Sequence, residues 1–557
     1  MSSGPPLILS LVFPVPPAPV PTRPRSCSSE SSLVFDLVIR NGLVIDGTRA
    51  PARKADVGVT GDRVVAVGDL ATASATRTID AAGRVVAPGF VDVHNHSDGW
   101  LVRQPHLTPK TLQGFTTEVL MADGISFAPV RRENADEWFF YLRALNALRI
   151  DEYLGWESLN DYLDLLDGNV AQNVCLHIPY ANVRVNACGF RRMLPDDFQM
   201  RQMKRAIVEG MDAGAVGLST GLDYIAQCFS NTNELVDACA AMAPQKGLYV
   251  THVRYKRGTL EGVKEAVEIG KRAGVPVHIS HLKATTPRDI DELLKYIDTV
   301  ARKEVDFSFD VYPYLPGSTM LNYLLPYDAW EDGPFGVMSR IRTPEMIARF
   351  AAGLEAYQLG LEDIHIAWVQ GKENSRHQGK LLSDYVLEMG LPPAEALTNL
   401  LLEERLAVLL VFNQGDDQLV RPFLSHDLYM MGTDGIYHED GVIHPRMYGS
   451  TGRLLGPCVR DWKWMTLEEA VYKLSGFAAK RFGLKDRGEI REGAFADLVV
   501  FDPATITDPA TFADPHQPTV GVSHVLVNGR SIVRDGVPVP DAELAEQWPG
   551  RSLRRGV

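Results

Sequence analysis

The sequence predicts an α/β protein: a (β/α)8 barrel of the TIM type with a small β-sandwich built from both chain ends. Strand-like and helix-like runs alternate through residues 89–480, which is typical of a parallel sheet covered by helices. Short strands separated by turns occupy residues 35–88 and 481–540. Histidines and aspartates follow several strand-like runs, and barrels of this type carry their chemistry at the carboxyl ends of the strands.

The two ends of the chain are predicted to form one sandwich. In residues 35–88, turns at Asn41 and Gly61 separate apolar runs, which is the pattern of β-hairpins. Residues 481–540 have the same character, and pairing the two parts would cover sheet edges that otherwise stay open. Residues 541–557 are predicted to form a tail.

Residues 1–32 differ from the rest of the chain. A short apolar run is followed by prolines and then by serines, and no Lys or Arg precedes Arg23. A secretory signal needs a basic start and a longer apolar core. We expect a disordered tail or an over-extended start, with a weak export signal as the alternative.

The predicted barrel consists of repeated β-then-α units. The helix-like runs at 194–214 and 258–274 each end in glycine, the residue preferred just after a helix. The strand-like runs are NVCLHIPY, AVGLST, LYVTHVR, VPVHISH, DFSFDVYPY and LYMMGTDG. Residues 313–375 are irregular and too long for a plain βα loop, so we expect them to form a lid over the site.

Composition argues against several kinds of partner. The 557 residues carry a formal net charge of -14, which disfavours nucleic acid and anionic membrane surfaces. No run of about 18 apolar residues occurs, so no membrane span is predicted. The six cysteines are scattered without a CxxC pair, which favours a reducing compartment, and we expect a cytoplasmic protein.

The histidines indicate a metal site. His94 and His96 lie two residues apart at the end of a strand-like run, so their side chains share one face and form half of a metal site. His252 and His281 lie in the strand-like runs of two consecutive βα units. His278, three residues before His281, is expected to point to the opposite face of its strand.

Asp434 is the candidate group for proton transfer. It follows an apolar strand-like run and precedes a glycine turn. A carboxylate at that position is placed to orient a water at the metal site and to accept its proton.

The chain also contains a set of longer motifs. These are PGFVDVHNHSD, LQGFTTEVLMADGISFAP, LSTGLDY, THVR, ISHLK, DVYPYLPGSTML, GTDG, HPRMYG and DRGEIREGAFADLVVFDP. Together they resemble the amidohydrolase superfamily and, more narrowly, the N-acyl-D-amino-acid deacylases (D-aminoacylases), from about residue 35 to 535. The resemblance implies a metal-dependent (β/α)8 barrel, zinc, and hydrolysis of an N-acyl bond on a D-amino acid.

The resemblance implies a role for each candidate residue. His94 and His96 match the metal ligands of the first barrel strand, and His252 and His281 match those of the fifth and sixth. Asp434 matches the catalytic acid/base of the eighth strand.

A carboxylate-binding pocket is implied in the same way. Lys283 matches a residue that binds the substrate carboxylate, and Tyr312, Ser318 and Arg446 match the same pocket by motif. The expected partner is therefore a small-molecule substrate bearing a carboxylate.

One position departs from the family. D-aminoacylases carry a metal-binding cysteine where this chain has Asp123, in the run Met121 to Gly124. A carboxylate can bind or bridge zinc, but it is a harder and weaker donor than a thiolate. One and two zinc ions are both open, and Glu118 is a rival ligand to Asp123.

Another amidohydrolase design is disfavoured. Many amidohydrolases bridge two metals with a carbamylated lysine on the fourth strand. The lysines between His96 and His252 are Lys110, Lys204 and Lys246, and none lies in a strand-like run. A hydantoinase or dihydroorotase site of that kind is therefore not expected.

We thus expect a zinc hydrolase of linear amides, in which Asp434 moves the proton between the attacking water and the leaving amine. Two alternatives stay open: hydrolysis of another amide, peptide or lactone, and a non-catalytic barrel that serves as a scaffold. The sequence does not decide the acyl group, the amino-acid side chain, the stereochemistry or the oligomeric state, and a homo-oligomer stays open.

Overall fold

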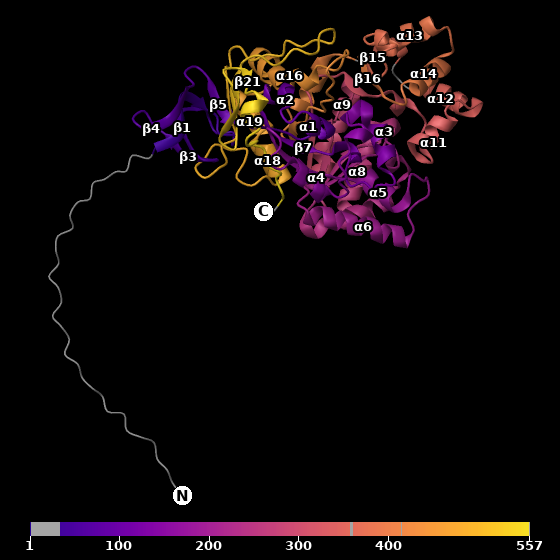
Figure 1. Cartoon of the computed structure of the whole chain (residues 1–557), viewed down its shortest axis with the longest axis horizontal. Coiled ribbons are helices and arrows are strands. Elements are labelled where there is room, and N and C mark those ends of the chain that lie inside the picture. The colour runs from indigo at the N-terminus through magenta and orange to yellow at the C-terminus, as the bar shows by residue number, and fades with distance from the viewer. Residues whose placement is uncertain (2–33, 357–359, 414, 556–557) are drawn as a thin grey trace, which may run out of the picture.

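A computed structural model describes Met1 and residues 34–356, 360–413 and 415–555. Apart from Met1, the expectation for residues 1–32 therefore lies outside the described residues. Figure 1 shows a large sheet at one end of the molecule, the barrel in the middle, and a layer of inserted helices at the far end. Among the described residues, none of the helices combines the length and apolar character needed to cross a bilayer.

The barrel has eight strand positions, and all the pairings between its strands are parallel. In chain order they are β6 (Phe90–Asp92), β7 (Phe115–Leu120), β8 with β9 (Asn173–Leu176 and Ile178–Pro179), β10 (Gly217–Gly221), β11 (Leu248–His252), β12 (Val277–Ile279), β13 (Phe307–Val311) and β17 (Tyr429–Met431). The ring closes between β17 and β6, where the Val93 N–H donates to Met431 O at 3.2 Å. A parallel bridge between Asn95 and Gly435 continues this contact into the mouth.

Apolar side chains form much of the barrel interior below the mouth. They belong to one buried cluster: Val91, Val93, Val119, Cys175, Val216, Leu248, Val250 and Met430. Helix α18 (Gly476–Phe482) packs Ala478, Ala479 and Phe482 onto this cluster. Since Leu248 is the first residue of its strand, α18 covers the amino ends and leaves the carboxyl ends for polar groups.

Helices follow the barrel strands. Around the barrel they are α1 (Asp98–Arg103), α2 (Thr108–Thr111), α3 (Ala135–Asn146), α4 (Leu159–Leu166), α5 (Tyr180–Cys188), α6 (Asp197–Asp212), α7 (Thr232–Ala240), α8 (Thr259–Ala273), α9 (Pro287–Tyr296), α10 (Arg302–Glu304), α15 (Arg421–Leu424), α16 (Arg446–Arg453) and α17 (Leu467–Leu474). The two helix-like runs that end in glycine correspond to α6 and α8, and α8 is followed by Gly274 at φ 71°. That left-handed conformation is the one glycine adopts at low cost.

Strands from both chain ends form one nine-stranded sheet. The N-terminal part is β1 (Val34–Val44), β2 (Arg53–Thr60), β3 (Arg63–Gly68), β4 (Ser74–Asp80) and β5 (Val85–Pro88), and the C-terminal part is β18 (Leu498–Phe501), β19 (Val522–Val527), β20 (Arg530–Arg534) and β21 (Val537–Pro538). β5 and β18 join the two parts as an antiparallel pair. The chain then enters the barrel at Gly89, where a Cβ would lie 2.2 Å from Thr116 Oγ1, so only glycine fits.

The excursion between β13 and β17 is longer than the predicted lid at 313–375. It contains its own antiparallel sheet of β14 (Gly317–Met320), β16 (Val408–Phe412) and β15 (Ile364–Val369). It also holds α11 (Gly333–Arg340), α12 (Pro344–Ala356), α13 (Leu382–Met389) and α14 (Pro393–Glu403), which lie at the far end of the molecule in Figure 1. Because β14 pairs with β16, the excursion extends at least to Phe412. The chain returns to the barrel at Tyr429, the first residue of β17.

The last described residues lie against the barrel, although the sequence suggested a tail. After α19 (Asp541–Leu544), the Leu553 N–H donates to Val174 O at 2.7 Å. Leu553 also packs on the interior cluster, and Arg554 forms an ion pair with Asp164 at 2.7 Å. Leu553 and the arginine that follows it anchor this segment beside β8.

Candidate metal centre and active site

Strand β6 delivers His94 and His96 to the mouth of the barrel. His94 and His96 are 0% and 2% exposed, and their rings lie edge to face with centroids 5.6 Å apart. The loop after β17 holds this segment, because the Asp434 N–H donates to His94 O at 2.7 Å and the His96 N–H donates to Gly435 O at 3.1 Å. Hydrogen bonds between the segments that follow the first and last barrel strands therefore hold His94, His96 and Asp434 in place.

Asp123 reaches the centre of the mouth from a tight turn after β7. Met121 and Asp123 both adopt left-handed backbone conformations, with φ of 65° and 56°. Asp is one of the residues that tolerates this conformation best among those with a side chain. The next residue is Gly124, at φ 68°. A side chain does not fit there, because a Cβ would lie 2.4 Å from Gln227 Oε1 and 2.8 Å from the Thr220 backbone.

His252 and His281 face Asp123 from the other side of the mouth. His252 is the last residue of β11, and its Nδ1 lies 3.1 Å from Nε2 of His281. The expectation for His278 was wrong, because its ring also lies inside the barrel, where it contacts Ser308 and Asp310 at 2.8 and 2.9 Å. Alternation stops when β12 ends at Ile279, and His281, at φ 37°, turns back into the mouth.

The Asp123 carboxylate lies between four imidazoles. Its Oδ1 is 3.6 Å from His94 Nε2 and 3.7 Å from His281 Nε2. Its Oδ2 is 3.7 Å from His96 Nε2 and 3.9 Å from His252 Nδ1. Ligand atoms bound to one tetrahedral zinc at about 2.1 Å lie about 3.4 Å apart, close to these spacings. Two ligand groups result, one with His94 and His96 and one with His252 and His281, and both include Asp123.

Buried polar atoms without partners show that these residues fit a metal. Both ring nitrogens of His94, Nδ1 of His96 and Oδ1 of Asp123 have no hydrogen-bond partner in the described part of the chain. Burial alone would lower the pKa of His94, but Asp123, Asp310 and Asp434 together raise it to about 10. Burial would likewise raise the pKa of Asp123, yet the surrounding histidines hold it below its usual range. A cation satisfies such a cluster directly.

Asp434 lies beside the two ligand groups rather than within them. Its Oδ1 is 3.1 Å from Nε2 of His96 and 3.7 Å from Nε2 of His94, and its Oδ2 is 2.8 Å from Nη1 of Arg446. Burial would raise its pKa, but Arg446 and the histidines hold that pKa well below the usual range. The carboxylate is therefore ionised and able to accept a proton.

The four predicted substrate-binding residues meet beside Asp434. Arg446 begins helix α16, and its guanidinium lies over the Tyr312 ring at 4.5 Å. Lys283 Nζ donates to the Tyr312 hydroxyl at 2.7 Å, and a Cβ at Gly317 would lie only 2.8 Å from that amine. The Ser318 side chain instead donates to Leu410 O at 2.7 Å, while its carbonyl accepts from Arg446. Ser318 thus contributes its backbone here.

Two aspartates that the sequence analysis did not assign hold the histidine ligands. Asp310 accepts from the His281 N–H at 2.8 Å and lies 3.7 Å from Nδ1 of His94. Asp223 lies 3.4 Å from Nε2 of His252 and accepts from Tyr323 at 3.2 Å and from Tyr327. Carboxylates in this position fix the orientation of a histidine ligand. Both residues stand inside quoted motifs, DVYPY and LSTGLDY, and that was the available signal.

Below the mouth, Lys110 forms a buried ion pair with Asp92 and donates to Thr433 Oγ1 at 2.8 Å. Asp92 also accepts from the Thr433 N–H at 2.8 Å, so this group connects the strands that carry His94 and Asp434. Glu118, the rival ligand, lies 4.0 Å from Lys110, and neither ligand group found among the described residues includes it. Burial raises the pKa of Glu118 to about 7.

Comparison with known proteins places the chain. The model of the amidohydrolase family matches residues 77–307 and 402–533. A D-aminoacylase from Alcaligenes xylosoxydans xylosoxydans is 34% identical over 538 residues, which cover 95% of this chain and 99% of the relative. The chain belongs to the amidohydrolase family, in the branch of the D-aminoacylases. The family resemblance and the barrel fold predicted from the sequence are both confirmed.

Two solved structures are similar to this amidohydrolase over most of its length. One is an N-acyl-D-glutamate deacylase from Bordetella bronchiseptica in complex with zinc and a phosphonate inhibitor, with a TM-score of 0.77, 30% identity, and coverage of 93% of this chain and 99% of that one. The other is a D-aminoacylase with a binuclear metal centre, with a TM-score of 0.78, 32% identity, and coverage of 94% and 100%. Metal binding is thus established among the relatives of this amidohydrolase.

Proposed function

We propose that this amidohydrolase is a zinc-dependent deacylase that cleaves N-acyl-D-amino acids to a carboxylate and a free D-amino acid. The observation that carries the proposal is the single carboxylate of Asp123 between four histidines, with Asp434 beside them. The names of the relatives, D-aminoacylase and N-acyl-D-glutamate deacylase, support this reaction class.

His94, His96, Asp123, His252 and His281 would hold the metal. Zinc, when bound, polarises the amide carbonyl and makes hydroxide available at neutral pH. Because Asp123 belongs to both ligand groups, the site suits a second ion as well as one.

Asp434 is proposed to transfer the proton. Its ionised Oδ1 lies nearest to His96 and accepts the proton of the attacking water. The protonated carboxyl then returns this proton to the nitrogen of the leaving amine. Arg446 on Oδ2 keeps the resting carboxylate ionised and aimed at the mouth.

The substrate carboxylate is proposed to bind Arg446, Lys283 and Tyr312. Nε of Arg446 is buried and has no hydrogen-bond partner in the described residues, so the guanidinium keeps a donor for a ligand while Nη1 pairs with Asp434. A planar guanidinium suits a two-point grip on a carboxylate, and Lys283 adds a second positive charge. Ser318 helps by holding Arg446 through its carbonyl at 3.1 Å.

The test pairs metal content with turnover. Purified protein is analysed for zinc, and release of free amine is measured with matched N-acetyl-D- and N-acetyl-L-amino acids. We expect one to two equivalents of zinc and turnover of the D series, abolished by a chelator and restored by zinc. Zinc without turnover of either series would contradict the proposed substrate class, and turnover of esters or lactones alone would favour the alternative hydrolase. Absence of both metal and turnover would favour a scaffold.

A further inference from the structure

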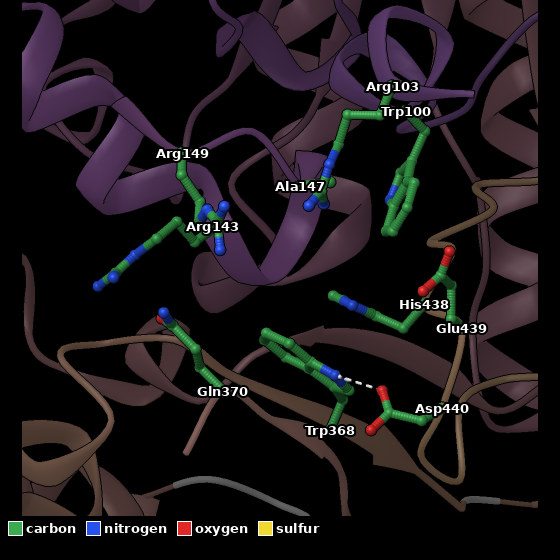
Figure 2. A pocket seen from close by; sticks show the side chains of 10 residues that line it. All are labelled: Trp100, Arg103, Arg143, Ala147, Arg149, Trp368, Gln370, His438, Glu439 and Asp440. Atoms are coloured by element: carbon green, nitrogen blue, oxygen red, sulfur yellow. Dashed lines mark hydrogen bonds between the residues drawn. The ribbon is translucent and has the colours of Figure 1, made fainter. Parts of the chain in front are cut away.

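A cavity lies outside the metal centre, between α1, the end of α3, β15 and the loop after β17. Its volume is about 180 Å³, and Figure 2 shows the side chains that line it. They are Trp100, Arg103, Arg143, Ala147, Arg149, Trp368, Gln370, His438, Glu439 and Asp440. None of these residues belongs to the ligand groups or to the proposed carboxylate pocket.

One side of this cavity carries positive charge and free donors. Arg103, Arg143 and Arg149 line that side in Figure 2, where Arg103 pairs with Glu152 at 2.7 Å and Arg149 with Asp151 at 3.2 Å. Arg143 forms no ion pair within 4 Å in the described part of the chain, and burial together with the neighbouring Arg405 lowers its pKa to about 10. Trp100 is 5% exposed, and its Nε1 has no hydrogen-bond partner among the described residues. A buried donor without a partner is costly unless a ligand supplies the acceptor.

The opposite side carries two carboxylates. Glu439 accepts from Gln104 at 2.5 Å through Oε1, and Asp440 accepts from the Trp368 indole at 2.9 Å through Oδ1. Each contact uses one carboxylate oxygen. Figure 2 places both acids across the cavity from Arg143 and Arg149.

An aromatic surface lies between the two charged sides. The rings of Trp368 and His438 are stacked, with centroids 3.9 Å apart and an interplanar angle of 16°. Trp100 packs against His438 at 90°. Burial lowers the pKa of His438 to about 4, so this ring is neutral at ordinary pH and behaves as part of an apolar wall.

We propose that this cavity binds a free, zwitterionic amino acid. The ligand carboxylate lies toward Arg143, Arg103 and Trp100 Nε1, and the ammonium lies toward Glu439 and Asp440. The side chain of the amino acid packs on Trp368 and His438. A simple anion would meet two carboxylates here and a simple cation would meet Arg143, which has no acidic partner within 4 Å among the described residues, so a ligand with both charges fits best.

The cavity also discriminates a free amino acid from its N-acylated form. An N-acyl amino acid keeps the carboxylate but has no ammonium, so it offers no positive charge to Glu439 and Asp440. Under the proposed function, on which this step rests, the ligand is the product class and the substrate is excluded. Two short chain segments connect the cavity to the metal centre: Trp100 lies four residues after His96, and His438 lies four residues after Asp434. A product molecule bound in the cavity could therefore change the rate of turnover through these two segments.

Binding is tested by calorimetry on the zinc-loaded protein with D-phenylalanine as the probe. We expect Arg143→Met and Glu439→Gln each to weaken one binding event by at least about tenfold, the loss of one charged hydrogen bond. The matched controls are Arg131→Met and Glu133→Gln, which alter an exposed ion pair at 3.8 Å. Glu439 is exposed, so its variant tests the site even if Arg143→Met, which loses bonds to Phe140 O and Arg405 O, fails to fold.

Two further probes test the charge pattern. 3-Phenylpropanoate lacks the ammonium and 2-phenylethylamine lacks the carboxylate, and each is expected to bind at least about tenfold more weakly than D-phenylalanine. Equal binding of either probe, or D-phenylalanine binding that is the same in both cavity variants as in wild type, would overturn the proposal. N-Acetyl-D-phenylalanine turnover is measured separately. Its absence would count against the proposed function, and amino-acid binding in the cavity would still be decided by the calorimetry.

Discussion

Oδ2 of Asp434 lies 2.8 Å from Nη1 of Arg446, and the exposed fraction of the arginine is 0%. The pair joins the proposed acid/base to a proposed substrate-binding residue. One guanidinium therefore affects two properties that kinetics can separate: the pKa of the carboxylate and the affinity for the substrate.

Replacing Arg446 should change both properties. In Arg446→Met the pKa of Asp434 rises. As the pH falls, the carboxylate is then protonated earlier, so the acid limb of the kcat/KM profile moves to higher pH. KM for an N-acetyl-D-amino acid should also rise by about tenfold or more, as a charged hydrogen bond is lost. Arg446→Lys keeps the charge but not the two-point grip, so it should preserve the acid limb while KM still rises. Matching pH profiles in wild type and Arg446→Met would contradict this coupling.

Asp434→Asn should abolish proton transfer without releasing the metal. We expect kcat to fall by roughly 10²–10⁴-fold, the usual contribution of a positioned acid/base. Zinc content should stay at the wild-type level, because Asp434 stands outside both ligand groups. The control is Asp461→Asn, which removes an exposed carboxylate paired with Arg460. Asp434→Asn activity within a few-fold of wild type would rule out the proposed role.

Asp123→Cys tests the departure from the family. A thiolate binds zinc more strongly than a carboxylate, so we expect this variant to retain about one equivalent of zinc with higher affinity. The left-handed backbone at φ 56° suits Asp and Asn but costs most other residues about 1–2 kcal/mol. Metal-free Asp123→Cys should therefore melt below metal-free Asp123→Asn. Equal melting temperatures would show that the backbone conformation does not select the carboxylate.

Asp223 connects the excursion to the metal centre. It contacts His252 at 3.4 Å and accepts from Tyr323 and Tyr327, which belong to the segment after β14. Asp223→Asn should lower zinc affinity by about 10–100-fold, as measured by competition with a chelating dye. Tyr327→Phe should have a smaller effect because Tyr323 still donates, and Tyr296→Phe on α9 serves as the control. Unchanged affinity in Asp223→Asn would mean that His252 needs no support from this carboxylate.

Glu118 should make stability depend on pH. Its pKa is raised from 4.5 to about 7, so between these values the folded state holds a proton that the unfolded state has lost. Folding stability contributed by this group therefore falls as pH rises through that window. Glu118→Gln removes the effect and should gain up to roughly 3 kcal/mol relative to wild type at pH 8, but little at pH 4. Thermal midpoints at several pH values measure this gain.

The comparison variant is Glu209→Gln. Glu209 is an exposed partner of Arg205 on α6, at 2.8 Å, and screening by solvent leaves such pairs little influence on stability. A pH-independent difference between Glu118→Gln and wild type would show that Glu118 keeps its ordinary pKa.

The sequence allowed the site to be predicted where strand geometry or a local motif decides the outcome. Strand alternation predicted that His94 and His96 lie together, and they do, although both follow the end of β6 at Asp92 and are held by the loop after β17. The same rule misplaced His278, because alternation ends with the strand at Ile279. Asp123 came from the family motif, since a left-handed turn cannot be derived from periodicity.

Residues whose partners are distant in the chain could not be predicted. Asp223 is recognised as a support for His252 only when Tyr323 and Tyr327 are folded onto it. Lys110 has an ordinary helical context in sequence, and its partners Asp92 and Thr433 meet only when the barrel closes. Similarly, Leu553 finds its place beside β8 only through tertiary packing.

The antiparallel pair of β5 and β18 has a consequence for how the protein is made. A ribosome releases β1–β5 first, and β5 then waits with an open edge while the whole barrel is synthesised. Open strand edges on a nascent chain invite pairing with other chains, so this edge stays exposed to mispairing until Leu498–Phe501 emerges. Translation that stops before β18 would leave a barrel beside an unpaired strand, and such fragments should aggregate rather than accumulate as folded protein.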